Sequence, residues 1–128
     1  MTNAAKPVDF PALHDPRHPV SAIGVRLEPF VRAIVEQIQP EKIILFGSYA
    51  YGQPNEHSDV DLLVIRRNID SDRNSNIEIR NAFETVGASL MSFTILSKTP
   101  ERIAERLKVR SPFYEDIVGK GIELYAAE

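Results

Sequence analysis

Two groups of residues near the middle of the chain, Gly47-Ser48 and Asp59-x-Asp61, have the types and spacing that could do chemistry. Gly47 ends an apolar run, where a glycine lets the backbone turn sharply and lets a ligand approach closely. Ser48 would open a short helix or turn, whose free N–H groups and hydroxyl suit a phosphate. Asp59 and Asp61 begin the next predicted strand on one face, so their carboxylates repel each other unless a cation lies between them. Because Mg²⁺ prefers carboxylates together with substrate phosphates, these residues predict a site for a magnesium-bound nucleoside triphosphate (NTP).

The spacing resembles the signature of the nucleotidyltransferase superfamily related to DNA polymerase β, most closely its minimal, MNT-type branch. In that signature Gly-Ser is followed by ten residues, then by Asp, one residue and Asp. Residues 49–58 provide this spacing here, and apolar strands flank the motif on both sides. The similarity in the order of elements extends from about residue 25 to the closing stretch at 121–125.

The resemblance implies a role for each residue of the motif. Gly47 and Ser48 would hold the triphosphate tail, Asp59 and Asp61 would bind the metal ions, and Ser58 would position the turn before the first aspartate. The implied reaction transfers a nucleoside monophosphate from a Mg²⁺-bound NTP, with ATP as the expected nucleotide, to a hydroxyl, and pyrophosphate leaves.

A third carboxylate, which active members of this superfamily carry on the next strand, is missing here. No Asp or Glu lies between Glu84 and Glu101, and the position that would carry the acid is Thr94, with Ser92 as the next candidate on the same face. A hydroxyl is a neutral, weaker magnesium ligand and no base at pH 7. We therefore expect the isolated protein to have low or no transfer activity.

The motif also lacks the arginines that relatives often carry after Gly-Ser. Tyr49 and Tyr51 stand there, and each could contact a phosphate or a base, or simply pack against the domain. His57 could touch a phosphate or an acceptor, but a role as an ordinary loop residue fits it better.

Two functional hypotheses follow. In the first, the chain is an enzyme whose hydroxyl acceptor lies on a partner, by analogy with MNT proteins that act as antitoxins of HEPN-type RNase toxins. In the second, it is a degenerate nucleotide-binding or antitoxin-type module that regulates a partner by docking. The sequence leaves open the NTP, the acceptor and whether the chain forms a homo-oligomer.

The elements that must position these residues form a small α/β (α+β) domain, with one mixed sheet of three or four strands flanked by four or five helices. Short apolar runs predict the strands at 43–46, 60–65, 90–96 and 122–125. Helical spacing and prolines suited to first turns predict helices over 29–38, 77–86, 100–107 and 112–118. The polar residues 66–76 predict a surface loop.

Residues 1–20 are expected to form an irregular arm, because four of the nine prolines fall there. Residues 21–128 would then form a single domain. His14 and His18 are four residues apart, but the surrounding prolines argue against a helical metal pair.

Composition limits the remaining alternatives. The 128 residues suffice for one core, and the formal net charge of -3 argues against a nucleic-acid partner or a polymerase. No cysteine is present, which excludes disulfides and thiol nucleophiles. The apolar runs are too short for a membrane span or a signal peptide, so we expect a cytoplasmic protein without a membrane partner.

Overall fold

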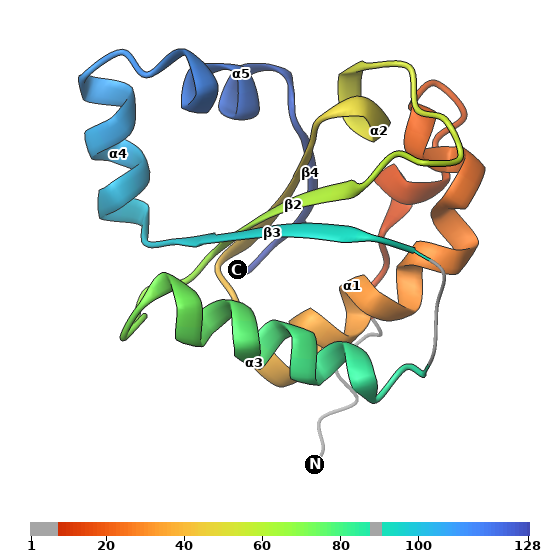
Figure 1. Ribbon diagram of the computed structural model, residues 1–128, viewed down its shortest axis with the longest axis horizontal. Helices are drawn as coiled ribbons and strands as arrows, with labels where there is room; N and C mark the ends of the chain where they lie inside the picture. The colour runs from red at the N-terminus through yellow and green to blue at the C-terminus, as the bar shows by residue number, and fades with distance from the viewer. Residues whose placement is uncertain (1–7, 88–90) are drawn as a thin grey trace.

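The computed structural model, described for residues 8–87 and 91–128, contains a four-stranded mixed sheet with the order β3-β2-β1-β4 (Figure 1). The strands are β1 (Lys42–Phe46), β2 (Val60–Ile65), β3 (Phe93–Lys98) and β4 (Ile122–Ala126). β1 runs antiparallel to β2 and β4, whereas β2 and β3 are parallel. The helices are α1 (Gly24–Ile38), α2 (Ser48–Tyr51), α3 (Asp72–Glu84), α4 (Pro100–Lys108) and α5 (Pro112–Lys120). This architecture confirms the predicted mixed α+β sheet flanked by helices.

The two faces of the sheet bury different sets of apolar residues. Helices α1 and α3 cover one face, and α4 and α5 lie toward the other (Figure 1). On the α1/α3 face, Ile43, Leu45, Leu62 and Val64 belong to the larger core cluster. On the other face, Leu63 and Ile65 pack with Ile103 of α4 and Ile117 of α5. Since side chains alternate along a strand, Asp61 shares the α4/α5 face with Leu63 and Ile65.

Helix α1 begins earlier than the sequence predicts. It starts at Gly24, so Pro29 lies inside the helix, and its placement in the first turn was wrong. The short 3₁₀ helix Pro19–Ile23 leads into α1, and a Cβ on Gly24 would lie 2.1 Å from the carbonyl oxygen of Leu13. The backbone of Gly24 therefore packs directly on the N-terminal segment. The predicted end is confirmed, because Gln39 adopts a left-handed φ of 54° just before Pro40.

Helix α3 also begins earlier than expected, at Asp72, so the predicted surface loop over residues 66–76 was wrong for its second half. Ser71 caps the helix, since its Oγ accepts a hydrogen bond from the backbone N–H of Asn74 at 3.0 Å. Asp72, Arg73 and Asn74 are exposed and the buried residue of this turn is the polar Ser75, which is why the turn carries no apolar spacing. The predicted stop is close to the observed one, at Glu84.

Strand β3 and the last two helices are near their predicted positions. β3 runs from Phe93 to Lys98, two residues beyond the predicted end, because its parallel register with β2 continues that far. Leu90, at the predicted start, lies outside the described residues. Helix α4 begins at Pro100, as predicted. Helix α5 begins at Pro112, as predicted, and of its residues only Ile117 is buried, whereas Phe113 and Val118 are 50% and 47% exposed.

The described part of the N-terminal segment, residues 8–23, contains two short 3₁₀ helices, Pro11–His14 and Pro19–Ile23. Phe10, Leu13 and Val20 are almost completely buried in the larger core. The guanidinium of Arg32 lies 5.1 Å from the centre of the Phe10 ring and donates a hydrogen bond to the carbonyl oxygen of Val8. This part of the chain therefore packs on α1.

Within the described ranges, no helix is both long and apolar enough to cross a membrane.

Candidate functional site

Gly47 joins β1 to α2 in a conformation that favours glycine. Its φ is +76°, and a Cβ at this position would lie 2.0 Å from Oδ2 of Asp61. β1 and β2 pair so that Phe46 faces Asp61, which brings the two segments together at this end of the sheet. The Asp61 carboxylate therefore rests against the backbone of Gly47, where any side chain would displace it.

Asp59, Asp61 and Thr94 come together at the point where β2 begins. The register pairs Asp61 with Thr94 across the parallel strands, and Oγ1 of Thr94 lies 3.4 Å from Oδ2 of Asp59 as a hydrogen-bond donor. Burial raises the pKa of the Asp61 carboxyl, the hydroxyl of Thr94 opposes this, and the charge of Asp59 adds to it. Thr94 thus stands beside both carboxylates, at the register position predicted for the missing acid.

The other predicted site residues lie around this group. Ser48 is the first residue of α2, and a Cβ on Gly52 would lie 2.8 Å from its Cα, so the short helix is closed tightly. Ser58 has a role in the motif loop, where its Oγ accepts a hydrogen bond from the backbone N–H of Asn55 at 2.8 Å. Ser92 precedes β3, and its carbonyl oxygen accepts a hydrogen bond from the N–H of Val60.

The two tyrosines of the motif differ in environment. Tyr49 is partly buried against the larger core cluster, whereas Tyr51 is 42% exposed. A tyrosine side chain is not a cation, so α2 itself supplies no positive charge to an anionic ligand.

The oxygen donors of the site suit Mg²⁺ that is also bound to a phosphate. Two carboxylates and one hydroxyl stand together, and among residues 8–87 and 91–128 no three His, Cys, Asp or Glu side chains form a group that could hold a metal. Magnesium commonly takes one or two carboxylates plus substrate phosphates and water, which matches this set. The donors do not provide the third carboxylate expected of a two-metal site.

A pocket of about 500 Å³ opens beside Asp59. The motif loop, Tyr49 of α2 and Ser92 form part of its wall, and the first turns of α1 contribute Arg26. Arg26 is not recognisable as a site residue from the sequence, because nothing in the local sequence connects the start of α1 with the motif. Only the absence of arginines after Gly-Ser indicates that a cation would have to come from another element.

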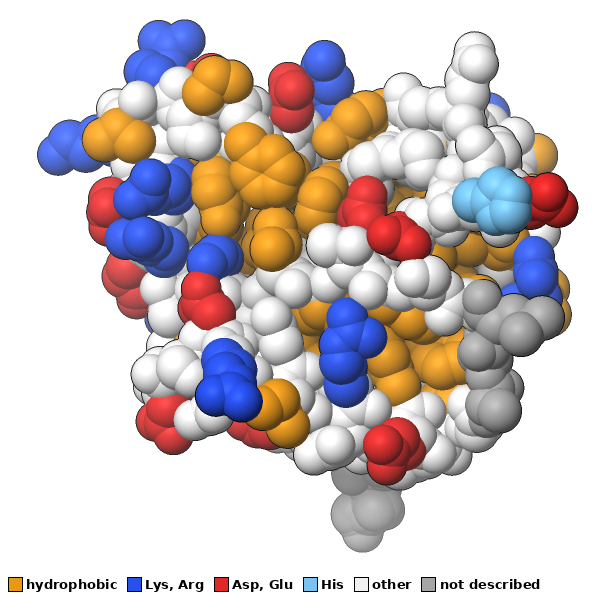
Figure 2. Space-filling model, in the orientation of Figure 1, with side chains coloured by type: hydrophobic (Ala, Val, Ile, Leu, Met, Phe, Trp, Pro, Cys, Tyr) orange, Lys and Arg blue, Asp and Glu red, His pale blue; other side chains and the backbone are white. Residues whose placement is uncertain are grey.

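An apolar area is exposed on the part of the surface formed by α4 and α5 (Figure 2). Phe113 of α5 is 50% exposed and packs edge-on against Phe46, the residue before Gly47, with ring centres 5.9 Å apart.

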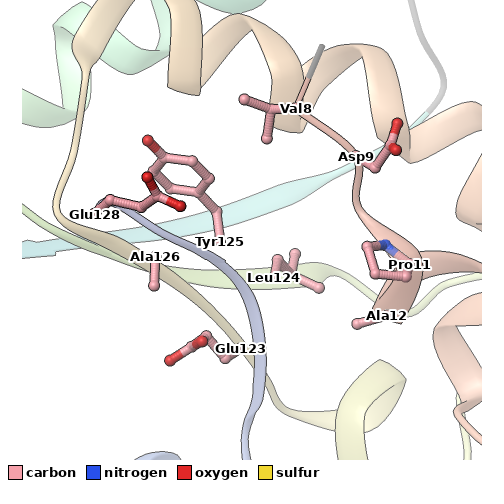
Figure 3. A pocket seen from close by; sticks show the side chains of 9 residues that line it. All are labelled: Val8, Asp9, Pro11, Ala12, Glu123, Leu124, Tyr125, Ala126 and Glu128. Atoms are coloured by element: carbon pink, nitrogen blue, oxygen red, sulfur yellow. The ribbon is translucent and has the colours of Figure 1, made fainter. Parts of the chain in front are cut away.

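A second pocket, of about 760 Å³, lies away from the site, between the N-terminal segment and β4 (Figure 3). Asp9, Glu123 and Glu128 add carboxylates to its lining. It contains none of the predicted site residues.

His14 and His18 form no group with other metal-ligating side chains in the described part of the chain. Nε2 of His14 lies 2.6 Å from Oε1 of Glu28, on α1, and His18 lies 3.7 Å from Asp15. The His14 contact therefore joins the N-terminal segment to α1, whereas the His18 contact lies within the segment.

Most of the chain matches a known protein family. The family described as Polbeta, "Polymerase beta, Nucleotidyltransferase", matches residues 31–126. A crystal structure of a protein assigned as a nucleotidyltransferase from Sulfolobus solfataricus aligns with a TM-score of 0.49 and 16% sequence identity, covering 80% of this chain and 82% of that chain. No protein among the curated sequences compared matches the chain significantly. The family match spans most of the chain, including the whole Gly47–Asp61 motif, and the chain therefore belongs to the polymerase β-type nucleotidyltransferases.

Proposed function

We propose that the chain binds a magnesium-bound NTP, with ATP as the expected nucleotide, and transfers its nucleoside monophosphate to a hydroxyl. The observation that carries this proposal is the contact of the Asp61 carboxylate with the Gly47 backbone, beside Asp59 and at the end of β1. This contact places the residues implied for the phosphates next to those implied for the metal.

In this proposal Asp59 and Asp61 hold Mg²⁺, which would neutralise negative charge on the phosphates and on the leaving pyrophosphate. Gly47 and Ser48 border the triphosphate, and Ser58 keeps the motif loop in shape through Asn55. The acceptor oxygen would form a bond to the α-phosphorus as the bond to the β-phosphate bridging oxygen breaks. The acceptor proton must then go to a base or to solvent.

The site offers no evident base for the proton of the acceptor hydroxyl, because the hydroxyl of Thr94 cannot accept it at pH 7. General-base catalysis contributes about 10²–10⁴-fold to rate. We therefore expect slow transfer by the isolated chain, and an acceptor on a partner protein, such as the HEPN-type toxin that the resemblance implies, could bring its own base.

Titration calorimetry with Mg·ATP tests the binding step. Asp61→Asn should remove most of the affinity, because it removes one of two anionic magnesium ligands. Asp70→Asn is the matched control, since Asp70 is exposed and lies outside the site. Equal affinity of the wild type and Asp61→Asn for Mg·ATP would contradict the proposed site.

A second candidate function, a nucleotide-binding module that docks without turnover, is favoured by the position of Thr94 beside Asp59 and Asp61. Thr94→Asp distinguishes the two candidates, because an added acid at this position should raise Mg²⁺-dependent release of pyrophosphate by about 10²-fold or more if the rest of the site is competent. Ser92→Asp is the control for position. If Mg·ATP binds but neither variant turns over, the binding module is the correct function.

A further inference from the structure

The proposed substrate is strongly anionic, yet the motif brings little positive charge to it. A triphosphate carries more negative charge than one Mg²⁺ can offset, and Asp59 and Asp61 add two carboxylates. Tyr49 and Tyr51 occupy the positions after Gly-Ser and supply no charge. A cation must therefore come from another element if the site is to hold a triphosphate well.

Most Lys and Arg side chains in the described part of the chain already have an ion-pair or hydrogen-bond partner. Arg102, Arg106, Arg110 and Lys120, on and around α4 and α5, each lie within ion-pair distance of a glutamate or aspartate. Lys98, at the end of β3, pairs with Asp72. These side chains could reach a ligand only by giving up their partners.

Arg26 is in the opposite situation. It lies in the first turn of α1 with an exposed side chain, and within residues 8–87 and 91–128 it makes no hydrogen bond or ion pair. Arg32, two turns further along the same helix, is instead held by Glu28 and by the carbonyl oxygen of Val8. Arg26 is therefore free to bind a ligand without a loss of internal contacts.

Arg26 and Asp59 line the same pocket, next to the motif loop. Of its described lining residues Arg26 is the one Lys or Arg, and the same lining includes Asp59, Tyr49 from α2 and Ser58 from the motif loop. The volume of about 500 Å³ is in the range of ligand sites. Glu56 and His57, also in the lining, lie 3.4 Å apart and largely offset each other when the histidine is protonated.

We infer that Arg26 binds the phosphate tail of the nucleotide from this pocket and replaces the positive charge that the motif helix lacks. The inference rests on the proposed function, since it assumes that an NTP binds beside Asp59. The planar guanidinium can bind two phosphate oxygens through a rigid pair of parallel N–H donors, a geometry that the single ammonium of a lysine does not have.

The test compares Arg26→Ala, Arg26→Lys and Arg73→Ala. Arg73 is a matched control, because it is exposed, makes no hydrogen bond or ion pair with a described residue, and lies on α3 outside the pocket. Dissociation constants are measured by calorimetry for three probes, Mg·ATP, Mg·tripolyphosphate and adenosine. Thermal unfolding without ligand checks that the variants fold as the wild type does.

Arg26→Ala should weaken Mg·ATP and Mg·tripolyphosphate by the same factor, about tenfold, and leave adenosine unchanged. Arg26→Lys should retain part of the affinity, and Arg73→Ala should bind as the wild type does. The salt dependence of Mg·ATP binding should become shallower in Arg26→Ala, because one phosphate contact has been lost.

Several results would overturn the inference. If Arg26→Ala binds both phosphate probes as the wild type does while Asp61→Asn does not, Arg26 has no such role and the proposed function stands. If Arg26→Ala changes the rate of transfer but no nucleotide affinity, the pocket holds the acceptor instead. Equal weakening by Arg73→Ala would indicate a general charge effect, and a wild type that binds no Mg·ATP would refute both proposals.

Discussion

Gly47 is the residue on which the geometry of the site depends most directly. Its left-handed φ and the 2.0 Å approach of Asp61 Oδ2 to a Cβ at that position leave no room for a side chain. The same contact fixes where the Asp61 carboxylate points.

Gly47→Ala should therefore destabilise the fold by about 1–3 kcal/mol and abolish Mg·ATP binding, because Asp61 must move. Chemical denaturation and calorimetry measure the two effects. Gly119→Ala is the control, since Gly119 lies in α5 with nothing within 4 Å of an added Cβ, and alanine there should be neutral or stabilising by up to about 1 kcal/mol. Equal effects of both substitutions would contradict the assignment of a special role to Gly47.

Asp61 should make the stability of the protein depend on pH. Burial raises its pKa in the folded state, so the folded chain binds the Asp61 proton more tightly than the unfolded chain does. This contribution favours folding below the unfolded pKa and is lost as pH rises through the folded pKa.

At neutral pH Asp61→Asn should therefore be at least as stable as the wild type, although it loses Mg·ATP binding. Below the unfolded pKa of Asp61 the advantage of the variant should disappear. Urea denaturation in Mg²⁺-free buffer over the range from pH 3 to pH 8 measures both. The free energy of unfolding of Asp61→Asn is compared with that of the wild type at each pH. If the variant falls below the wild type at neutral pH but not in acid, the ionised carboxylate stabilises the fold and the expectation is wrong.

Among the elements, helices and strands with regularly spaced apolar residues could be predicted from the sequence. The start of a helix whose first turn is polar could not. β1 and β2 are buried on both faces, so their runs at 43–46 and 60–65 stand out in the sequence, and the family spacing then led to Thr94. The first turn of α3 is entirely polar, even at the buried Ser75, and is held by a cap, so hydrophobic spacing misses it. Arg26 could not be found from the sequence either, because tertiary packing alone brings the start of α1 to the motif loop.

The two serine caps of the chain offer a direct test at this scale. Ser71 accepts a hydrogen bond from Asn74 N–H, whereas Ser111, at the equivalent place before α5, makes no side-chain cap bond. Ser71→Ala should cost about 1 kcal/mol of stability and Ser111→Ala clearly less, as measured by chemical denaturation. Similar losses would mean that the cap of α3 contributes little.

At the scale of the whole molecule, the N-terminal segment contributes more to the core than its sequence predicts. Its prolines indicate an irregular arm, but Phe10 is 1% exposed and lies under the guanidinium of Arg32. Proline-rich segments can still contribute apolar side chains to a core without forming long helices or strands.

Phe10→Ala should therefore destabilise the protein by about 3–5 kcal/mol, as expected of a buried phenylalanine. Val8→Ala is the control, because Val8 is 39% exposed whereas Phe10 is 1% exposed, and it should cost clearly less stability than Phe10→Ala. A loss below about 1 kcal/mol for Phe10→Ala would instead support the division into a loosely attached arm and a domain that begins near residue 21.

The order β3-β2-β1-β4 also has a kinetic consequence. The central strand β1 pairs with β4, as in the pair of Ile43 with Tyr125, and these partners are more than 80 positions apart in the sequence. Closing so large a loop is slow compared with forming local hairpins. During synthesis, β1 and β2 can leave the ribosome and pair while one edge of β1 is still open. Gly47 and Asp61 can therefore meet early, but the sheet that keeps them together is completed only when β4 has been made.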